Sequence, residues 1–142
     1  MKVSIHILSS FILFLILLPF LKSWAVIPFI SAILIDIDHY FYYAFTRKKL
    51  NFKNSYIFFN ELRKNSKKSG AGILYILCIF HTYEFLFLIA IFSLFSEVFV
   101  LITLGVAFHL ILDYIDFLTT KANYRKSKMF LHYFKIHKEE RL

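Results

Sequence analysis

The residues of this chain that are most able to do chemistry are the ionisable side chains inside its apolar stretches. Five of the nine carboxylates and four of the six histidines lie there. An ionised side chain in hydrocarbon costs about 2.5–3.5 kcal/mol on insertion scales, so such residues usually bind a ligand, an ion or one another. The set consists of His6, Asp36, Asp38, His39, His81, Glu84, His109, Asp113 and Asp116.

The spacing of these residues indicates a metal site between helices. Asp36 and His39 are three residues apart, and His109, Asp113 and Asp116 follow one another at intervals of four and three residues. Positions three, four or seven apart share one helical face, and carboxylate and histidine side chains at this spacing hold metal ions in four-helix bundles. The helices therefore carry polar stripes that suit metal binding.

Divalent metal ions are the natural counter-charge for these carboxylates. Carboxylates this numerous would repel one another unless cations neutralise them, and the apolar segments contain no lysine or arginine. Imidazole and carboxylate donors suit zinc, iron or manganese. We predict one to three divalent ions, zinc first, with the ligands His6, Asp36, Asp38, His39, His81, Glu84, His109 and Asp113. Glu84 and Asp116 are the predicted catalytic residues, with Glu84 as the general base if it does not bind metal.

Other roles stay open for some of these residues. A histidine or aspartate in a membrane helix can also form an interhelical hydrogen bond, which applies to His6 and Asp38. Asp116 could cap the end of the bundle. The single cysteine, Cys78, has no partner for a disulfide, a zinc ribbon or a CxxC redox pair, so thiol ligands are not expected.

The composition predicts that membrane helices position these residues. The 142 residues are 59% hydrophobic and 20% aromatic, with a mean hydropathy of +0.65, which is outside the range of soluble domains. Three glycines and two prolines are too few for the many tight turns of a β-sheet protein, and the apolar blocks are longer than the strands of an outer-membrane barrel. The predicted fold class is an all-α, integral membrane four-helix bundle that forms a single domain over residues 1–142.

Four apolar blocks are long enough to cross a bilayer of about 30 Å. The predicted helices cover about 5–21, 24–45, 71–95 and 98–118. The first block also fits a cleaved signal peptide in outline. Ser96 and Glu97 leave only a tight turn between the last two blocks, which predicts an antiparallel hairpin.

The basic residues predict the orientation of the chain in the membrane. Eight of the seventeen Lys and Arg residues fall in the loop 46–70 and seven in the tail 119–142. By the positive-inside rule, both segments and both termini are cytoplasmic, which places the protein in the inner membrane. Clustered charge of this kind favours contact with anionic lipids, and nucleic acid is not an expected partner. The tail and the loop are predicted to be amphipathic, and the loop suits a surface helix that could cover the site, with the apolar residues Tyr56, Ile57, Phe58, Phe59 and Leu62.

This topology brings the polar residues to one level in the membrane. His6, the segment 36–39 and the segment 109–116 all fall near the cytoplasmic ends of their helices. His81 and Glu84, which are three residues apart, lie about 15–20 Å into their helix at 1.5 Å per residue. They reach the same level only if the first turns of that helix protrude into the headgroup region.

At these residues the chain resembles the YdjM-like family of small membrane-bound, metal-dependent hydrolases. The matching elements are His6, Asp-Ile-Asp-His at 36–39, the motif from His81 to Glu84, and His-Leu-Ile-Leu-Asp at 109–113. The chain departs from the family where a His-Arg pair usually precedes a Thr-His-Ser, since Cys78-Ile-Phe stands before His81. The resemblance implies a metal-dependent hydrolase that is distantly similar to the zinc phospholipase C and P1 nuclease group, whose His-x3-Asp element matches positions 109 and 113.

The predicted function is hydrolysis of a phosphoester or lipid headgroup at the cytoplasmic leaflet, with water activated by a metal ion. Two other classes stay open. One is a transporter or channel for metal ions or protons, because intramembrane Asp, Glu and His also form ion pathways. The other is a non-catalytic membrane scaffold. The outer halves of two helices, at 9–20 and 85–95, are nearly all apolar, which favours a one-sided site over a transport path. The oligomeric state is left open.

Overall fold

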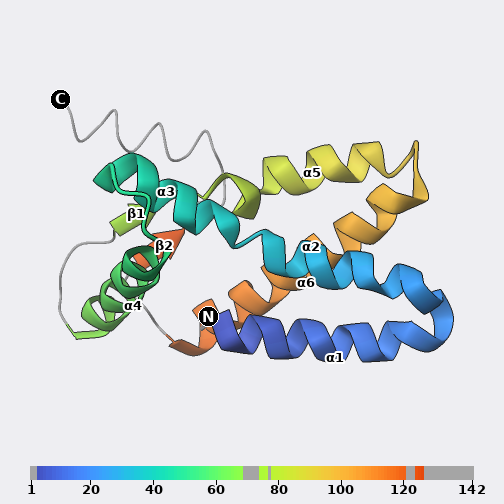
Figure 1. The fold of residues 1–142 in the computed structure, drawn as a ribbon, viewed down its shortest axis with the longest axis horizontal. Coiled ribbons are helices and arrows are strands. Elements are labelled where there is room, and N and C mark those ends of the chain that lie inside the picture. The colour runs from blue at the N-terminus through green and yellow to red at the C-terminus, as the bar shows by residue number, and fades with distance from the viewer. Residues whose placement is uncertain (1–2, 69–73, 77, 121–123, 127–142) are drawn as a thin grey trace. The chain divides into compact units, whose positions relative to one another are not determined.

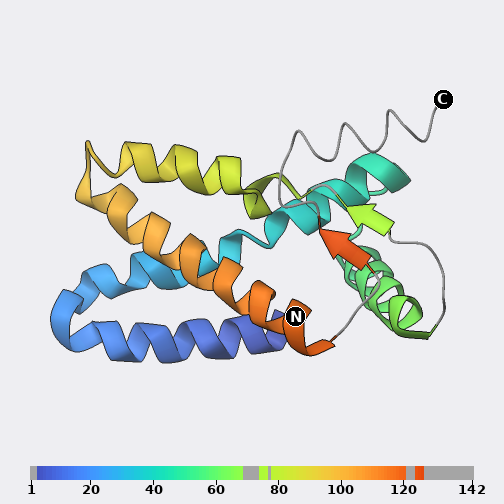
Figure 2. The same ribbon diagram turned by 180° about the vertical axis from the view of Figure 1, so that it is seen from behind.

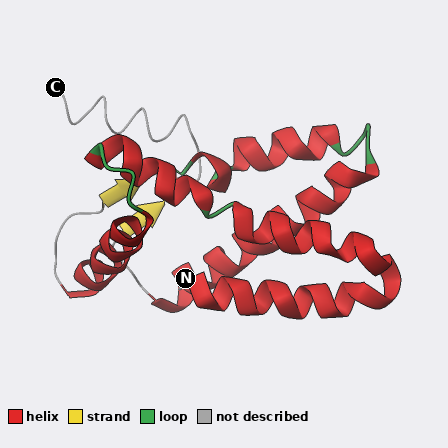
Figure 3. Ribbon diagram, in the orientation of Figure 1, coloured by secondary structure: helices red, strands yellow, loops and turns green. Residues whose placement is uncertain are grey.

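The structure, a computed structural model, describes residues 3–68, 74–76, 78–120 and 124–126. Most of these residues are helical, as predicted (Figure 3). The helices are α1 (Val3–Leu21), the 3₁₀ helix η1 (Lys22–Ala25), α2 (Val26–Leu34), α3 (Ile37–Arg47), α4 (Phe52–Lys68), the 3₁₀ helix η2 (Ile79–His81), α5 (Tyr83–Phe92) and α6 (Glu97–Thr120). The exception to the all-α prediction is a short pair of parallel strands, β1 (Leu74–Ile76) and β2 (Tyr124–Lys126).

Two helical stretches are long and apolar enough to cross a membrane. One is Val3–Arg47, which contains α1, α2 and α3, and the other is Glu97–Asp116 within α6. Helix α5 is apolar but shorter. Insertion of these helices into a membrane, and their orientation there, stay predictions.

The chain divides into two compact units, Met1–Ile35 with Phe85–Thr120, and Asp36–Glu84 with Lys121–Leu142. The first unit contains α1, η1, α2, α6 and nearly all of α5 (Figure 1). The second contains α3, α4, η2 and the strand pair. Most of the predicted basic tail, at 121–123 and 127–142, lies outside the described residues.

In the first unit, α6 packs closely along α2, and α1 packs against both (Figure 2). Gly105 of α6 makes this approach possible, because a Cβ atom at this position would overlap Ser31 Oγ and the Pro28 carbonyl oxygen of α2. Ser31 Oγ donates a hydrogen bond to the Ile102 carbonyl oxygen at 3.3 Å, which ties the two helices together. Small residues are the usual means by which apolar helices approach this closely. His109 lies one turn beyond Gly105 on the same face of α6, so this contact also positions the first candidate site.

In the second unit, aromatic rings hold α3 against α4. Tyr40 stacks on Phe52 with the ring centroids 3.9 Å apart, and Tyr43 contacts Phe58 at 5.6 Å. The Arg47 guanidinium lies over the Phe58 ring, 4.9 Å from its centroid. Helix α4 occupies most of the loop 46–70, where the sequence predicts an amphipathic helix.

Two of the predicted long helices are interrupted. The block 24–45 begins with η1, and α2 ends before Asp36, which occupies the N-cap position of α3. The Asp36 carboxylate makes no capping hydrogen bond to α3, and the backbone forms a turn at Ile35 and Asp36 before the second helix begins. A second helix therefore begins inside a continuous apolar run.

The block 71–95 differs more from its predicted form, because α5 begins only at Tyr83. Cys78 and Thr82 are extended on either side of η2. Thr82 Oγ1 donates to the Ile79 carbonyl oxygen at 2.8 Å, and Glu84 lies in the first turn of α5, where a negative charge is favourable. These polar residues lie at the start of α5, which the apolar pattern of the block 71–95 does not indicate.

Candidate metal-binding groups

The first group of possible metal ligands lies in the unit formed by α1, α2 and α6. It contains His6 from α1 and His109 and Asp113 from adjacent turns of α6. His6 Nε2 is 3.3 Å from Asp113 Oδ1, and His109 Nε2 is 4.0 Å from Asp113 Oδ2. The two imidazole rings stack with their centroids 4.1 Å apart and their planes 10° from parallel. Both histidines are buried, with 2% and 0% of their surface exposed.

A backbone carbonyl fixes the tautomer of His109. Its Nδ1 lies 2.7 Å from the carbonyl oxygen of Ala32, one of the last residues of α2. Because a carbonyl oxygen only accepts hydrogen bonds, Nδ1 carries the proton and donates it. The neutral ring then carries its lone pair on Nε2, the nitrogen that faces Asp113. Histidine ligands are commonly held by a hydrogen bond of this kind from their other ring nitrogen.

The separations in this group fit a shared metal ion. Two atoms bound to one tetrahedral zinc ion at 2.0–2.1 Å lie about 3.3 Å apart. The observed 3.3 and 4.0 Å are at or slightly above this value, and one ligand atom from each residue lies within 4.8 Å of the others. Two imidazoles and one carboxylate are also a donor set that divalent transition metals prefer.

Two buried polar atoms on α1 belong to the surroundings of this group. Within the described part of the chain, His6 Nδ1 and Ser10 Oγ have no hydrogen-bond partner. The two residues are one helical turn apart and both are buried. Such orphaned polar atoms are rare in folded proteins and indicate a polar neighbour such as water or an ion.

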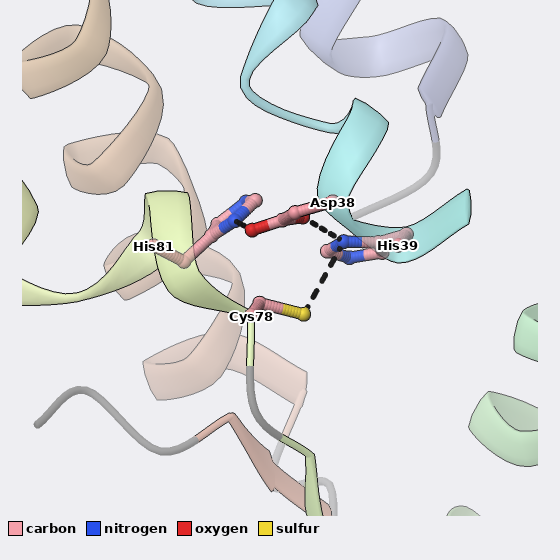
Figure 4. A group of neighbouring side chains, drawn as sticks. All are labelled: Asp38, His39, Cys78 and His81. Carbon is pink, nitrogen blue, oxygen red and sulfur yellow. Dashed lines mark hydrogen bonds and ion pairs between the residues drawn. The ribbon is translucent and has the colours of Figure 1, made fainter. Parts of the chain in front are cut away.

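The second group lies in the other unit and is centred on Asp38 of α3 (Figure 4). Asp38 Oδ1 lies 2.7 Å from His39 Nδ1, and Asp38 Oδ2 lies 2.8 Å from His81 Nδ1. The backbone N–H of Phe80 donates to Asp38 Oδ2 at 3.1 Å. The carboxylate of Asp38 therefore lies between the two imidazole rings and contacts each through the same ring position.

Asp36 faces the opposite edges of these two rings. Its Oδ1 atom is 3.5 Å from His81 Nε2 and 3.9 Å from His39 Nε2. Its carboxylate makes no capping hydrogen bond to the helix that it precedes. About a fifth of the Asp36 and His39 side chains is exposed, at 19% and 21%, whereas His81 is 1% exposed.

Cys78 is the one member of this group that the sequence analysis did not expect. Its Sγ atom lies 3.4 Å from His39 Nδ1, and the residue is buried. A single cysteine gives no specific signal of a metal site in the sequence, so Cys78 joins this group only through its position in the structure. Phe59 of α4 packs on the other side of His39, with the ring centroids 4.9 Å apart.

The two predicted catalytic carboxylates lie elsewhere. Glu84 is exposed in the first turn of α5, and Asp116 is half-buried in α6. Among the described residues, no group of potential metal ligands includes either of them. Their catalytic roles, and the ligand role of Glu84, stay predictions.

The buried His, Asp and Cys groupings have the donors and the separations needed to hold a metal ion. Six of the eight predicted ligands belong to the two groups described above, and Asp36 faces two of them. The capacity to bind a metal ion is inferred from these side chains and distances alone.

No family model, no curated protein and no solved structure matches the chain.

Proposed function

We propose that this chain is a membrane-embedded, metal-dependent hydrolase that acts on a phosphoester or lipid headgroup. The proposal agrees with the resemblance to the YdjM-like family. The observation that carries it is the buried group of His6, His109 and Asp113, held within 4.8 Å of one another on two apolar helices.

The number of ligands in this group supports catalysis over a purely structural role. Catalytic zinc sites commonly have three protein ligands and leave a further position for water or substrate, whereas structural sites are closed by four. Two histidines and one carboxylate form such a three-ligand set. A divalent metal bound there would supply a Lewis acid that activates water and stabilises the negative charge that develops during hydrolysis.

The protein residues around the group have roles of their own. The Ala32 carbonyl holds the ring of His109 and keeps the proton on Nδ1. Asp113 faces Nε2 of both rings, at 3.3 Å from His6 and 4.0 Å from His109, so one carboxylate and two imidazole nitrogens converge on one position. The rings' close stacking fixes their separation. The site is therefore preorganised, which is the condition for efficient electrostatic stabilisation.

We infer the substrate class from two properties of the chain, its apolar helices and its basic segments. The helices that carry the group are apolar and expose many large hydrophobic side chains, which suits a lipid environment. Lys48, Lys49 and Lys53 are exposed in the basic segment that follows α3, and such clusters attract anionic headgroups. An anionic phospholipid is the substrate that combines both properties.

The test is metal content together with hydrolysis, measured on the full chain purified in lipid nanodiscs. We expect bound divalent metal and a chelator-sensitive phosphoesterase activity on anionic lipid. The double variant His109→Ala with Asp113→Asn should lose the activity and the metal held by this group. His132→Ala, which removes a histidine of the basic tail, is the matched control. Hydrolysis that survives in the double variant, or a wild-type chain without metal or activity, would contradict the proposal.

A further inference from the structure

Helix α1 contains two buried polar atoms that have no hydrogen-bond partner among the described residues. They are His6 Nδ1 and Ser10 Oγ, and the two residues are 2% and 0% exposed. The neighbouring His109, which is equally buried, has its Nδ1 bonded to the Ala32 carbonyl oxygen. Buried polar atoms in folded proteins nearly always bond to protein or to ordered water. The two atoms of α1 therefore indicate a further hydrogen-bonding group in the protein interior.

The two atoms lie on one face of α1. His6 and Ser10 are four residues apart in this helix, and side chains at this spacing are neighbours with Cβ atoms about 5–6 Å apart. Within the described chain neither atom has a partner, so His6 Nδ1 and Ser10 Oγ do not bond each other directly. One water that bonds to both would join atoms about 4.5 Å apart, at about 2.8 Å for each hydrogen bond. The spacing suits a single bridging water, the usual partner of such buried groups.

His109 shows what a partner at Nδ1 does in this group. Its ring stacks on that of His6 within 10° of parallel, and both rings present Nε2 to Asp113. The Ala32 carbonyl oxygen holds His109 from the other side, at Nδ1. A histidine that binds metal through Nε2 keeps its proton on Nδ1, and the acceptor of that proton orients the ring. His6 therefore needs an acceptor as well.

We propose that Ser10 is a positioning residue for His6, and that one buried water bound between Ser10 Oγ and His6 Nδ1 orients the imidazole ring towards Asp113. The water accepts from the Nδ1–H group and donates to the hydroxyl oxygen, so both buried atoms are satisfied. Ser10 thus acts through His6. The inference rests on the proposed function, because it assigns a role at the same metal-binding group.

Zinc titration of the metal-depleted full chain in nanodiscs tests the role of Ser10. The zinc to follow is the fraction that is lost in His109→Ala with Asp113→Asn. Ser10→Ala removes the hydroxyl group and should weaken this binding by about 10–100-fold, as loss of an orienting partner typically does. The zinc bound per chain at saturation should not change. Ser9→Ala, the same substitution at the adjacent and less buried serine, is the matched control and should keep the wild-type affinity. Equal affinities in the two variants would overturn the proposal.

The water itself can be detected in the metal-depleted wild-type chain, which keeps the proposal testable if a variant fails to fold. We expect a nuclear Overhauser cross-peak between a long-lived water and the ring protons of His6. The cross-peak should remain in Ser9→Ala and disappear in Ser10→Ala. Its absence from the wild type would refute the bridging water, and its persistence in Ser10→Ala would refute the role of Ser10.

Hydrolysis separates positioning by Ser10 from direct catalysis. Because the hydroxyl acts through His6, Ser10→Ala should lose activity at low zinc and regain it at saturating zinc. Lost activity at saturating zinc with an unchanged zinc affinity would make Ser10 a nucleophile and overturn the proposal. A chain that binds zinc and water as expected but hydrolyses nothing would support this inference and contradict the proposed function. A zinc hydrolase in which Ser10→Ala changes neither the affinity nor the water would contradict this inference alone.

Discussion

At the scale of single residues, His109 has both a structural and a functional task. Its Nδ1–H caps the carbonyl of Ala32, one of the last carbonyls of α2, while its Nε2 faces Asp113. His6 stacks on the same ring but makes no hydrogen bond through Nδ1 within the described chain. Removal of His109 therefore leaves the Ala32 carbonyl without this donor, whereas removal of His6 breaks no hydrogen bond between protein groups at Nδ1.

Replacing each histidine by phenylalanine separates these tasks, because phenylalanine keeps the stacked ring. His109→Phe leaves the Ala32 carbonyl without its buried donor, which costs about 1–3 kcal/mol. His6→Phe breaks no bond to a backbone carbonyl, and the protein contact that it removes is the 3.3 Å contact with Asp113 Oδ1, a side chain that is partly exposed. We expect His109→Phe to lower the unfolding free energy of the metal-depleted protein by about that amount more than His6→Phe, in denaturant titrations in detergent. Equal losses in the two variants would show that the bond to Ala32 contributes nothing.

The sequence predicted the identity of these residues better than their tasks. The spacing of His109 and Asp113 placed them on one helical face, and both belong to one group with His6. The sequence could not predict which ring nitrogens Asp36 and Asp38 face, because this depends on how the rings of His39 and His81 are oriented. Cys78 was set aside because a thiol without a second cysteine gives no specific signal.

At the scale of elements, the contact between α2 and α6 determines the geometry of the first group. Gly105 allows the two helices to approach, and Ala32 and His109 meet about one turn further along. A side chain at Gly105 would meet backbone atoms of Pro28, which have little freedom to move. The site is therefore sensitive to a residue that contacts none of the ligands.

Gly105→Ala tests this coupling between packing and binding. We expect a loss of about 1–3 kcal/mol in unfolding free energy from overpacking, together with weaker metal binding, because α6 must move away from α2. Thermal unfolding and metal titration measure the two effects. Leu104→Ala, an exposed neighbour on α6, is the control and should leave metal affinity unchanged. Unaltered metal binding in Gly105→Ala would show that the helix contact does not position the group.

The helices could be predicted from the sequence where one apolar block forms one uninterrupted helix. Helix α6 covers the predicted block 98–118 with only small extensions at both ends. The sequence predicts one helix over 71–95, but its apolar residues are equally compatible with a strand, a 3₁₀ turn and a helix, and only Thr82 and Glu84 lie as polar residues at the start of α5. In the block 24–45 the sequence predicts a metal ligand at Asp36 and gives no signal for the break before α3, because Asp36 occupies the N-cap position without a side-chain cap hydrogen bond.

At the scale of the whole molecule, the charge distribution and the apolar helices predict how the chain lies in a membrane. Fifteen of the seventeen Lys and Arg residues lie in the segments 46–70 and 119–142. Two helical stretches are long and apolar enough to span. The positive-inside rule then predicts that these basic segments and both termini lie in the cytoplasm.

Reporter fusions test this orientation. We expect green fluorescent protein to be fluorescent and alkaline phosphatase to be inactive when either is fused after residue 142, because the carboxyl terminus stays in the reducing cytoplasm. Alkaline phosphatase inserted at Lys22, between the first two apolar blocks, should be active. Active phosphatase at the carboxyl terminus would reverse the predicted topology, and extraction of the chain by alkaline carbonate would exclude a spanning protein.

Binding of a divalent metal by histidine and carboxylate side chains can be measured by X-ray absorption spectroscopy of the purified, metal-loaded protein, because this method reports the ligand atoms of the bound ion. We expect a first shell of nitrogen and oxygen at about 2.0–2.1 Å, with imidazole scattering and no sulfur. A sulfur shell at about 2.3 Å, or the absence of any tightly bound metal, would contradict metal binding by these side chains.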